Sequence, residues 1–81
     1  MLTKKQIKLA ILNGKEEQVY DQLVTNLIRK RYSQNSIEAI INNYLGDTTN
    51  EKYIKEFNEM QSFRKQCKAQ AKTIINEVKG G

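Results

Sequence analysis

Hydrophobic side chains recur every three or four residues through most of this chain, which is the spacing of one face of an α-helix. In residues 3–13 that face consists of Ile7, Ala10 and Ile11. Thr3 and Gln6 have the spacing of a capping box at its start. Asn13 and Gly14 follow, and both residue types accept the left-handed backbone that closes many helices. The pattern predicts a first helix over residues 3–13.

A second helical pattern, over residues 15–31, has a broad hydrophobic stripe and a favourable order of charges. Acidic residues lie near its start, and Arg29, Lys30 and Arg31 lie at its end, so both ends complement the helix dipole. The stripe comprises Val19, Tyr20, Leu23, Val24, Leu27 and Ile28. Its width predicts that this helix forms the main wall of the core.

Turn and cap residues at positions 32–36 separate the second helix from a short, strongly apolar third helix over residues 36–45. Its hydrophobic residues are Ile37, Ile40, Ile41, Tyr44 and Leu45. Gly46 ends this pattern. Thr48 and Glu51 then repeat the capping-box spacing, which predicts the start of a fourth helix.

Residues 49–78 contain no glycine or proline and predict one continuous helix about 43 Å long. Its hydrophobic positions are spaced alternately four and three residues apart, as in the a/d seam of a coiled coil. The seam consists of Tyr53, Phe57, Met60, Arg64, Cys67, Ala71, Ile74 and Val78. The sequence contains no strand pattern. We therefore expect an all-α fold, a small bundle of three shorter helices and one long C-terminal helix, in a single domain over residues 1–81.

Two interpretations of this seam stay open. In the first, the whole seam packs on the three shorter helices as core. In the second, its distal half overhangs, because the first and third helices are only about 15 Å long and the second about 25 Å. A partner chain, most simply a second copy, would then cover a partner seam made of Arg64, Cys67, Ala71, Ile74 and Val78. Arg64 would either set the register of that assembly or lay its stem on the core with its head in solvent.

The residue types present narrow the range of chemistry. The chain has no histidine and one cysteine, Cys67, so it lacks the commonest general base, the usual zinc clusters and an internal disulfide. Its carboxylate pairs lie among polar residues, without the apolar surroundings that perturb catalytic carboxylates. We expect a non-enzymatic protein with no catalytic, metal or cofactor site, in which Cys67 is a small buried hydrophobic residue.

The charge balance adds a second candidate partner. Fourteen Lys and Arg against nine Asp and Glu give a net charge of +5, which favours an anionic partner. The candidate phosphate contacts are Arg29, Lys30, Arg31, Lys65, Lys68 and Lys72. The last three share one helix face, while the first three would grip DNA if the second and third helices formed a helix-turn-helix. Both groups also suit helix C-termini, where the dipole favours positive charge. Nucleic-acid binding is therefore the alternative to a protein partner.

No apolar run approaches the length of a membrane-spanning helix, and the first residues show no signal-peptide core. We therefore expect no membrane partner and a cytoplasmic location. The main functional expectation is a helical protein–protein interaction or assembly module.

Two segments resemble small proteins encoded near tail and lysis genes in phages and prophages of Gram-positive bacteria. These segments are Leu27-Ile28-Arg29-Lys30-Arg31-Tyr32-Ser33 and Phe63-Arg64-Lys65-Gln66-Cys67-Lys68-Ala69-Gln70-Ala71-Lys72. The resemblance covers the middle and final thirds of the chain. Between the motifs, the segment from Ile37 to Asn58 is longer than the family's compact acidic stretch. The resemblance implies a phage accessory or virion-associated protein without catalytic residues, whose partner is a phage structural protein or another copy.

Overall fold

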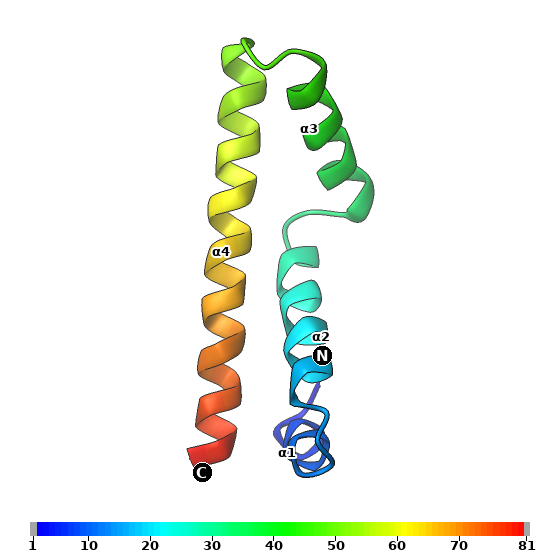
Figure 1. The fold of residues 1–81 in the computed structure, drawn as a ribbon, viewed down its shortest axis with the longest axis vertical. Helices are drawn as coiled ribbons and strands as arrows, with labels where there is room; N and C mark the ends of the chain where they lie inside the picture. The colour runs from blue at the N-terminus through cyan, green and yellow to red at the C-terminus, as the bar shows by residue number, and fades with distance from the viewer. Residues whose placement is uncertain (1, 81) are drawn as a thin grey trace.

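The computed structural model describes residues 2–80, and this part of the chain folds into four α-helices without strands. They are α1 (Lys4–Leu12), α2 (Glu16–Arg29), α3 (Gln34–Gly46) and α4 (Glu51–Gly80). The predicted all-α class, with three shorter helices and a long final one, is confirmed. The molecule is a rod of 47 × 19 × 19 Å (Figure 1).

Both ends of α1 follow the local sequence signals. The N–H of Gln6 donates to Thr3 Oγ1 at 3.2 Å and the N–H of Thr3 donates to Gln6 Oε1 at 2.9 Å, which confirms the capping box. At the other end Gly14 has a φ of 75°, as its position predicted. The N–H of Lys15 then donates to the carbonyl of Ala10, and α1 closes in a Schellman motif.

The starts of α3 and α4 differ from those expected. Ser33 Oγ accepts the N–H of Ser36 at 3.0 Å, so α3 is capped at Ser33 and begins two residues earlier than predicted. Asn50 Oδ1 accepts the N–H of Tyr53 at 3.2 Å, and α4 therefore starts after Asn50. The predicted cap at Thr48 is wrong, because the amide oxygen of Asn50 performs that role.

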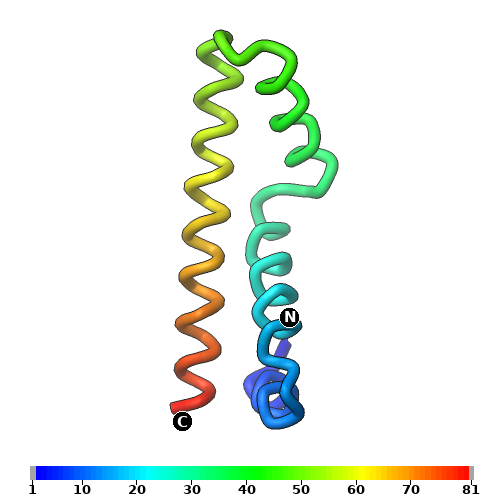
Figure 2. The backbone as a smooth tube through the Cα atoms, in the orientation of Figure 1, coloured from blue at the N-terminus to red at the C-terminus, as the bar shows by residue number. Residues whose placement is uncertain are grey.

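The helices α2 and α3 follow one another along the same side of α4, which runs antiparallel to them over the length of the rod (Figures 1 and 2). Their 14 and 13 residues together give about 40 Å of helix, close to the roughly 45 Å of the 30-residue α4. α1 turns back beside α2 and contacts both α2 and α4. Because two short helices add their lengths, α4 has a neighbour along most of its length.

The hydrophobic core lies toward one end of this rod, between α1, α2 and the C-terminal half of α4. Its buried residues are Ile7, Val19, Leu23, Val24, Leu27, Ile28, Cys67, Ala71 and Ile75. Five of these nine come from the predicted stripe of α2, so α2 is the main wall of the core as expected. We call residues 34–60 the arm, and the rest of the chain, residues 1–33 and 61–81, the base.

The predicted overhang of the distal seam is wrong. α4 is continuous, yet Cys67 and Ala71 are buried in the core, with no exposed surface left on Ala71. Ile74 and Val78 pack against the same core, and Arg64 is half-buried. Of the predicted partner seam, Cys67 and Ala71 are fully covered, and Arg64, Ile74 and Val78 are half-buried beside α1 and α2, so this half of α4 does not overhang. For this half of the seam the core interpretation is correct.

The register of α4 also departs from a heptad repeat. A straight α-helix has 3.6 residues per turn, whereas a heptad averages 3.5, so the inward position drifts by about 20° in each heptad. Two heptads after the buried Met60 this drift amounts to only about 40° at Ile74, so it does not by itself select the inward residue. The packing of α1 and α2 on this half of α4 does so, and it leaves Ile75 only 5% exposed and Ile74 half-buried. The a/d spacing thus predicted a helix correctly but misassigned its last inward residue.

Candidate functional site

The arm is a two-helix hairpin in which α3 packs against the first half of α4. No residue of α3 is buried, although five of its side chains are large and apolar. Leu45 is 68% exposed. The half-buried apolar side chains of the arm are Ile37, Ile40, Ile41, Tyr44, Tyr53, Ile54 and Phe57. A pair of helices cannot cover its own apolar faces completely, so the arm keeps an unfinished hydrophobic surface.

Contacts within the arm hold this surface in an ordered shape. The rings of Tyr44 and Phe57 stack with centroids 4.2 Å apart and planes 10° from parallel, which fastens α3 to α4. In the connecting turn, the carboxylate of Asp47 accepts hydrogen bonds from the hydroxyl of Thr49 at 2.7 Å and its N–H at 3.1 Å. These hydrogen bonds hold the pKa of Asp47 below its usual value.

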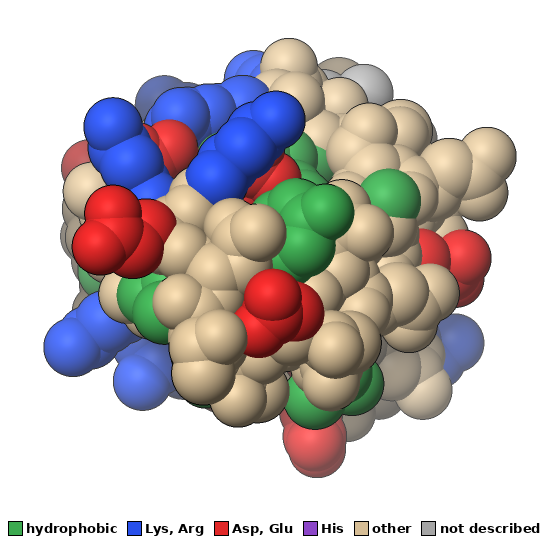
Figure 3. Space-filling model, turned by 90° about the horizontal axis from the view of Figure 1, so that it is seen from above, with side chains coloured by type: hydrophobic (Ala, Val, Ile, Leu, Met, Phe, Trp, Pro, Cys, Tyr) green, Lys and Arg blue, Asp and Glu red, His purple; other side chains and the backbone are tan. Residues whose placement is uncertain are grey.

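Charge separates the arm from the base. The arm carries five acidic and two basic side chains, a net charge of −3, whereas the base carries four acidic and twelve basic ones, a net charge of +8. The acids of the arm are Glu38, Asp47, Glu51, Glu56 and Glu59. Seen from the end of the rod with the α3–α4 turn, hydrophobic side chains reach the surface beside both acidic and basic ones (Figure 3), and within the arm the acidic ones are the more numerous. The unfinished surface of the arm therefore lies in an acidic setting.

A second exposed apolar patch lies on α1, at the other end of the rod. Ile7 faces the core, while Leu9 is 51% and Leu12 73% exposed. Lys5 and Lys8 are also exposed and lie next to the two leucines around the helix, where they border a hollow with Glu77 and Val78 of α4. The outer face of α1 is thus apolar and basic, where the arm is apolar and acidic.

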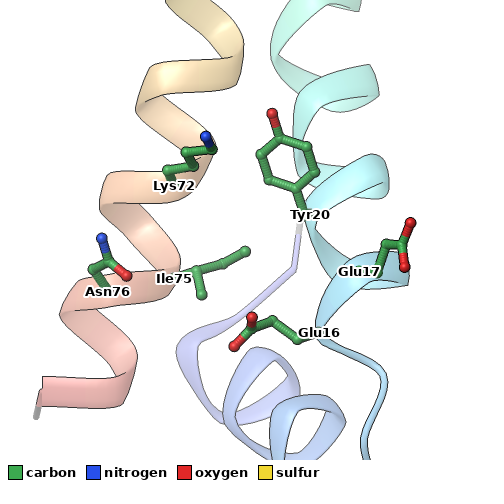
Figure 4. Close-up of a pocket in the computed structure, with 6 residues that line it drawn as sticks. All are labelled: Glu16, Glu17, Tyr20, Lys72, Ile75 and Asn76. Atoms are coloured by element: carbon green, nitrogen blue, oxygen red, sulfur yellow. The ribbon is translucent and has the colours of Figure 1, made fainter.

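One hollow of the base opens between α2 and α4 and has a volume of about 540 Å³ (Figure 4). It is lined by Glu16, Glu17, Tyr20, Lys72, Ile75 and Asn76. Glu17 points away from α4 in the close-up, and Glu16 forms an ion pair with Lys79. Among residues 2–80 no three His, Cys, Asp or Glu side chains are placed to hold a metal ion. We find no arrangement in this hollow that indicates a reaction.

The candidate phosphate contacts on α4 are accessible. Lys65, Lys68 and Lys72 are exposed. Within residues 2–80 the ion pair between Lys79 and Glu16 is the one salt bridge, so these three lysines have no carboxylate partner. They form a positive stripe on the base.

The other candidate phosphate contacts lie at the C-terminal end of α2, and two of them border different hollows. Arg29 lines a hollow with Arg64, whereas Arg31 lines another with Phe63. The guanidinium of Arg31 lies 5.1 Å from the centre of the Phe63 ring, a cation–π contact. Arg29, Lys30 and Arg31 are all exposed, but they do not join the lysines of α4 in one continuous groove.

Cys67 behaves as the sequence predicted, and Phe63 also packs inside the base. Cys67 is buried, and desolvation raises the pKa of its thiol, so the reactive thiolate is disfavoured. Phe63 packs against the core and meets the ring of Tyr32 edge to face at 5.7 Å. Neither is an accessible reactive group.

Sequence reasoning missed the arm as a candidate surface. Each of its apolar residues was recognised as part of a helix face, but their half-exposed state depends on how many helices surround them. A usable signal was present, because the combined length of the second and third helices matches that of the last. That match predicts an end-to-end arrangement, in which α3 has α4 as its main neighbour.

No protein-family model, curated protein or solved structure matches this chain. The phage resemblance therefore stays a prediction. Among described residues, no helix is both long and apolar enough to cross a bilayer.

Proposed function

We propose that this chain is a non-enzymatic protein–protein interaction and assembly module that binds its partner through the arm. The observation that supports this is that α3, a 13-residue helix with five large apolar side chains, buries none of them. Contiguous exposed apolar surface on a small protein marks an interaction site. Removing such surface from water is favourable by about 25 cal/mol for each Å².

The arm replaces the distal seam as the partner surface in this proposal. The distal seam packs on α1 and α2 with Cys67 and Ala71 fully buried, whereas α3 in the arm has no buried residue. Its half-buried Tyr44, Tyr53 and Phe57 belong to the residue types enriched at protein interfaces. A partner helix laid on the arm would complete a three-helix layer and supplement the thin core expected of an 81-residue chain.

Site-specific photo-cross-linking tests the arm directly. A photoreactive residue at position 45 is compared with one at Ala69, an exposed site on the base, in the cells that make the protein. We expect an adduct of discrete mass, identified by mass spectrometry, at position 45 and none at position 69. Ile41→Asp should weaken this adduct about tenfold, since it puts a charge in the apolar surface.

The matched control is Asn42→Asp, which adds the same charge at the neighbouring exposed position of α3. Circular dichroism verifies that both variants remain helical. Equal adducts at positions 45 and 69, or no adduct at either, would contradict an interaction through the arm.

The resemblance of residues 27–33 and 63–72 supports a phage or prophage setting for this module. In that setting its partner is a virion or tail-region component, or another copy of the chain. Mass spectrometry of the peptide attached at position 45 identifies which of these two is the partner.

Nucleic-acid binding is the second candidate, favoured by the three exposed lysines of α4 without carboxylate partners and by the net charge of +8 on the base. Three phosphate contacts predict that affinity for mixed-sequence duplex DNA falls about 40-fold between 50 and 200 mM salt. Reversing Lys65, Lys68 and Lys72 to glutamate should abolish this binding and leave cross-linking at position 45 unchanged. DNA binding that is absent at 50 mM salt excludes this candidate.

A further inference from the structure

The large hydrophobic side chains that are exposed within residues 2–80 lie at the two ends of the rod. Leu9 and Leu12 are on the outer face of α1, and Leu45 is at the tip of the arm. α1 and the α3–α4 turn lie at opposite ends of the long axis (Figure 1). One subunit therefore cannot cover its own exposed leucines by bringing these two surfaces together.

The two surfaces carry opposite charges in similar patterns. On α3, Glu38, Ile41 and Leu45 are spaced three and four residues apart and so form one stripe, with Asp47 just beyond it. On α1 the corresponding stripe is basic and apolar, running through Lys5, Lys8 and Leu9 to Leu12. An acidic–apolar stripe therefore lies at one end of the molecule, and a basic–apolar stripe of similar length lies at the other.

Charge decides between the pairings of these surfaces. Contact between two arms brings two surfaces of charge −3 together, and contact between two α1 faces brings lysine against lysine. Like charges placed together disfavour a pairing, whereas opposite charges favour it and speed association. The pairing that combines apolar contact with opposite charge is the arm of one molecule with α1 of another.

Resting on the proposed function of the arm, we infer that its partner is a second copy of this chain, which docks the outer face of its α1 there. Such a contact is heterologous, because the two surfaces that meet are different. Each added copy leaves one arm and one α1 free, so the assembly extends into a filament or closes into a ring. The apolar surface of the arm and the exposed leucines of α1 are then covered by the same contact.

Two blocked variants of the full chain test this arrangement. Leu45→Lys blocks the arm by opposing the lysines of α1, and Leu12→Glu blocks α1 by opposing the acids of the arm. Both positions are more than two-thirds exposed, so both variants should keep the wild-type helix content and unfolding temperature. Light scattering then measures the mass of each protein across concentration.

We expect the wild type to exceed the mass of a dimer as its concentration rises, and each variant alone to stay monomeric, with association weakened about tenfold or more. An equimolar mixture of the two variants should regain association and form at least a 1:1 complex. This occurs because the first variant keeps an intact α1 and the second keeps an intact arm. Higher salt should dissociate both the wild-type assembly and the mixed complex.

Three results would overturn the inference. The first is a wild type that stays monomeric at every concentration. The second is a Leu12→Glu variant that dimerises alone, as an arm-to-arm contact requires. The third is a mixture that stays monomeric while the wild type assembles. The controls Gln18→Glu and Ala69→Lys make the same kinds of charge change at exposed sites outside both surfaces and should retain wild-type masses. If a foreign protein is cross-linked at position 45 while the purified wild type stays monomeric, this inference fails and the proposed function stands.

Discussion

At the scale of single residues, two glycines end helices in different ways. Gly14 follows α1 with a φ of 75°, in the left-handed region that side chains with a Cβ avoid, whereas Gly46 is the last residue of α3 and has no positive φ. At both positions a Cβ would meet no atom within 4 Å. Substitution to alanine at these sites therefore probes backbone conformation without steric contact.

We expect Gly14→Ala to lower the free energy of unfolding by about 1 kcal/mol, because alanine is strained in the left-handed conformation. Gly46→Ala is the matched control and should be neutral or raise it by up to about 1 kcal/mol, since alanine favours the helix. Urea denaturation followed by circular dichroism measures both. Equal effects of the two substitutions would show that the left-handed closure of α1 does not contribute to stability.

At the scale of elements, α4 is a straight helix that borders three others. Its first half meets α3, and its second half meets α2 and α1. In the second half, Cys67, Ala71 and Ile75 are buried at a spacing of four residues, in place of the alternating four and three of a heptad seam. A supercoiled seam would bury Ile74 instead.

Alanine substitutions at the adjacent Ile74 and Ile75 distinguish the observed packing of α4 from a heptad seam. Ile75→Ala should cost about 3 kcal/mol of unfolding free energy, as for a fully buried isoleucine. Ile74→Ala should cost less than half as much, because Ile74 is partly in solvent. The loss of stability relative to the wild type should be the same at every protein concentration for both variants, since these side chains are covered within one subunit. A larger loss at Ile74, or a loss that grows on dilution, would favour the seam between chains.

At the scale of the whole molecule, the base and the arm differ in how their helices are held. The base contains the core cluster, whereas α3 has no buried residue. Met60, fully buried where the arm meets the base, is the exception among the hydrophobic side chains of the arm. Local opening of α3 therefore exposes little additional apolar surface and costs little free energy.

Amide hydrogen exchange should report this difference. In dilute monomer, we expect the amides of α3 to exchange about tenfold or more faster than those in the middle of α2, whose residues line the core. Comparison of residues 38–45 with residues 22–28 by mass spectrometry avoids the frayed helix ends. Equal protection in both segments would mean that the arm and the base unfold as one unit.

Much of the local structure was predictable, because it depends on interactions between residues that are close together in the sequence. The capping box at Thr3, the left-handed Gly14 and the amphipathic stripe of α2 all depend on residues within about one or two turns of each other. Errors were confined to competing local donors and acceptors, as at Asn50, which caps α4 in place of Thr48. The buried position of Cys67 was also correctly inferred.

By itself, the sequence determined four helices, their ends to within a few residues, and which of their faces are apolar. Tertiary structure alone decided that α2 and α3 follow one another along α4, and so which apolar faces are covered. An apolar stripe indicates that a helix needs a neighbour, but the burial energy is non-directional and does not specify which neighbour or at what height. For this reason the distal half of α4 lies inside the subunit, and the uncovered surfaces are the arm and the outer face of α1.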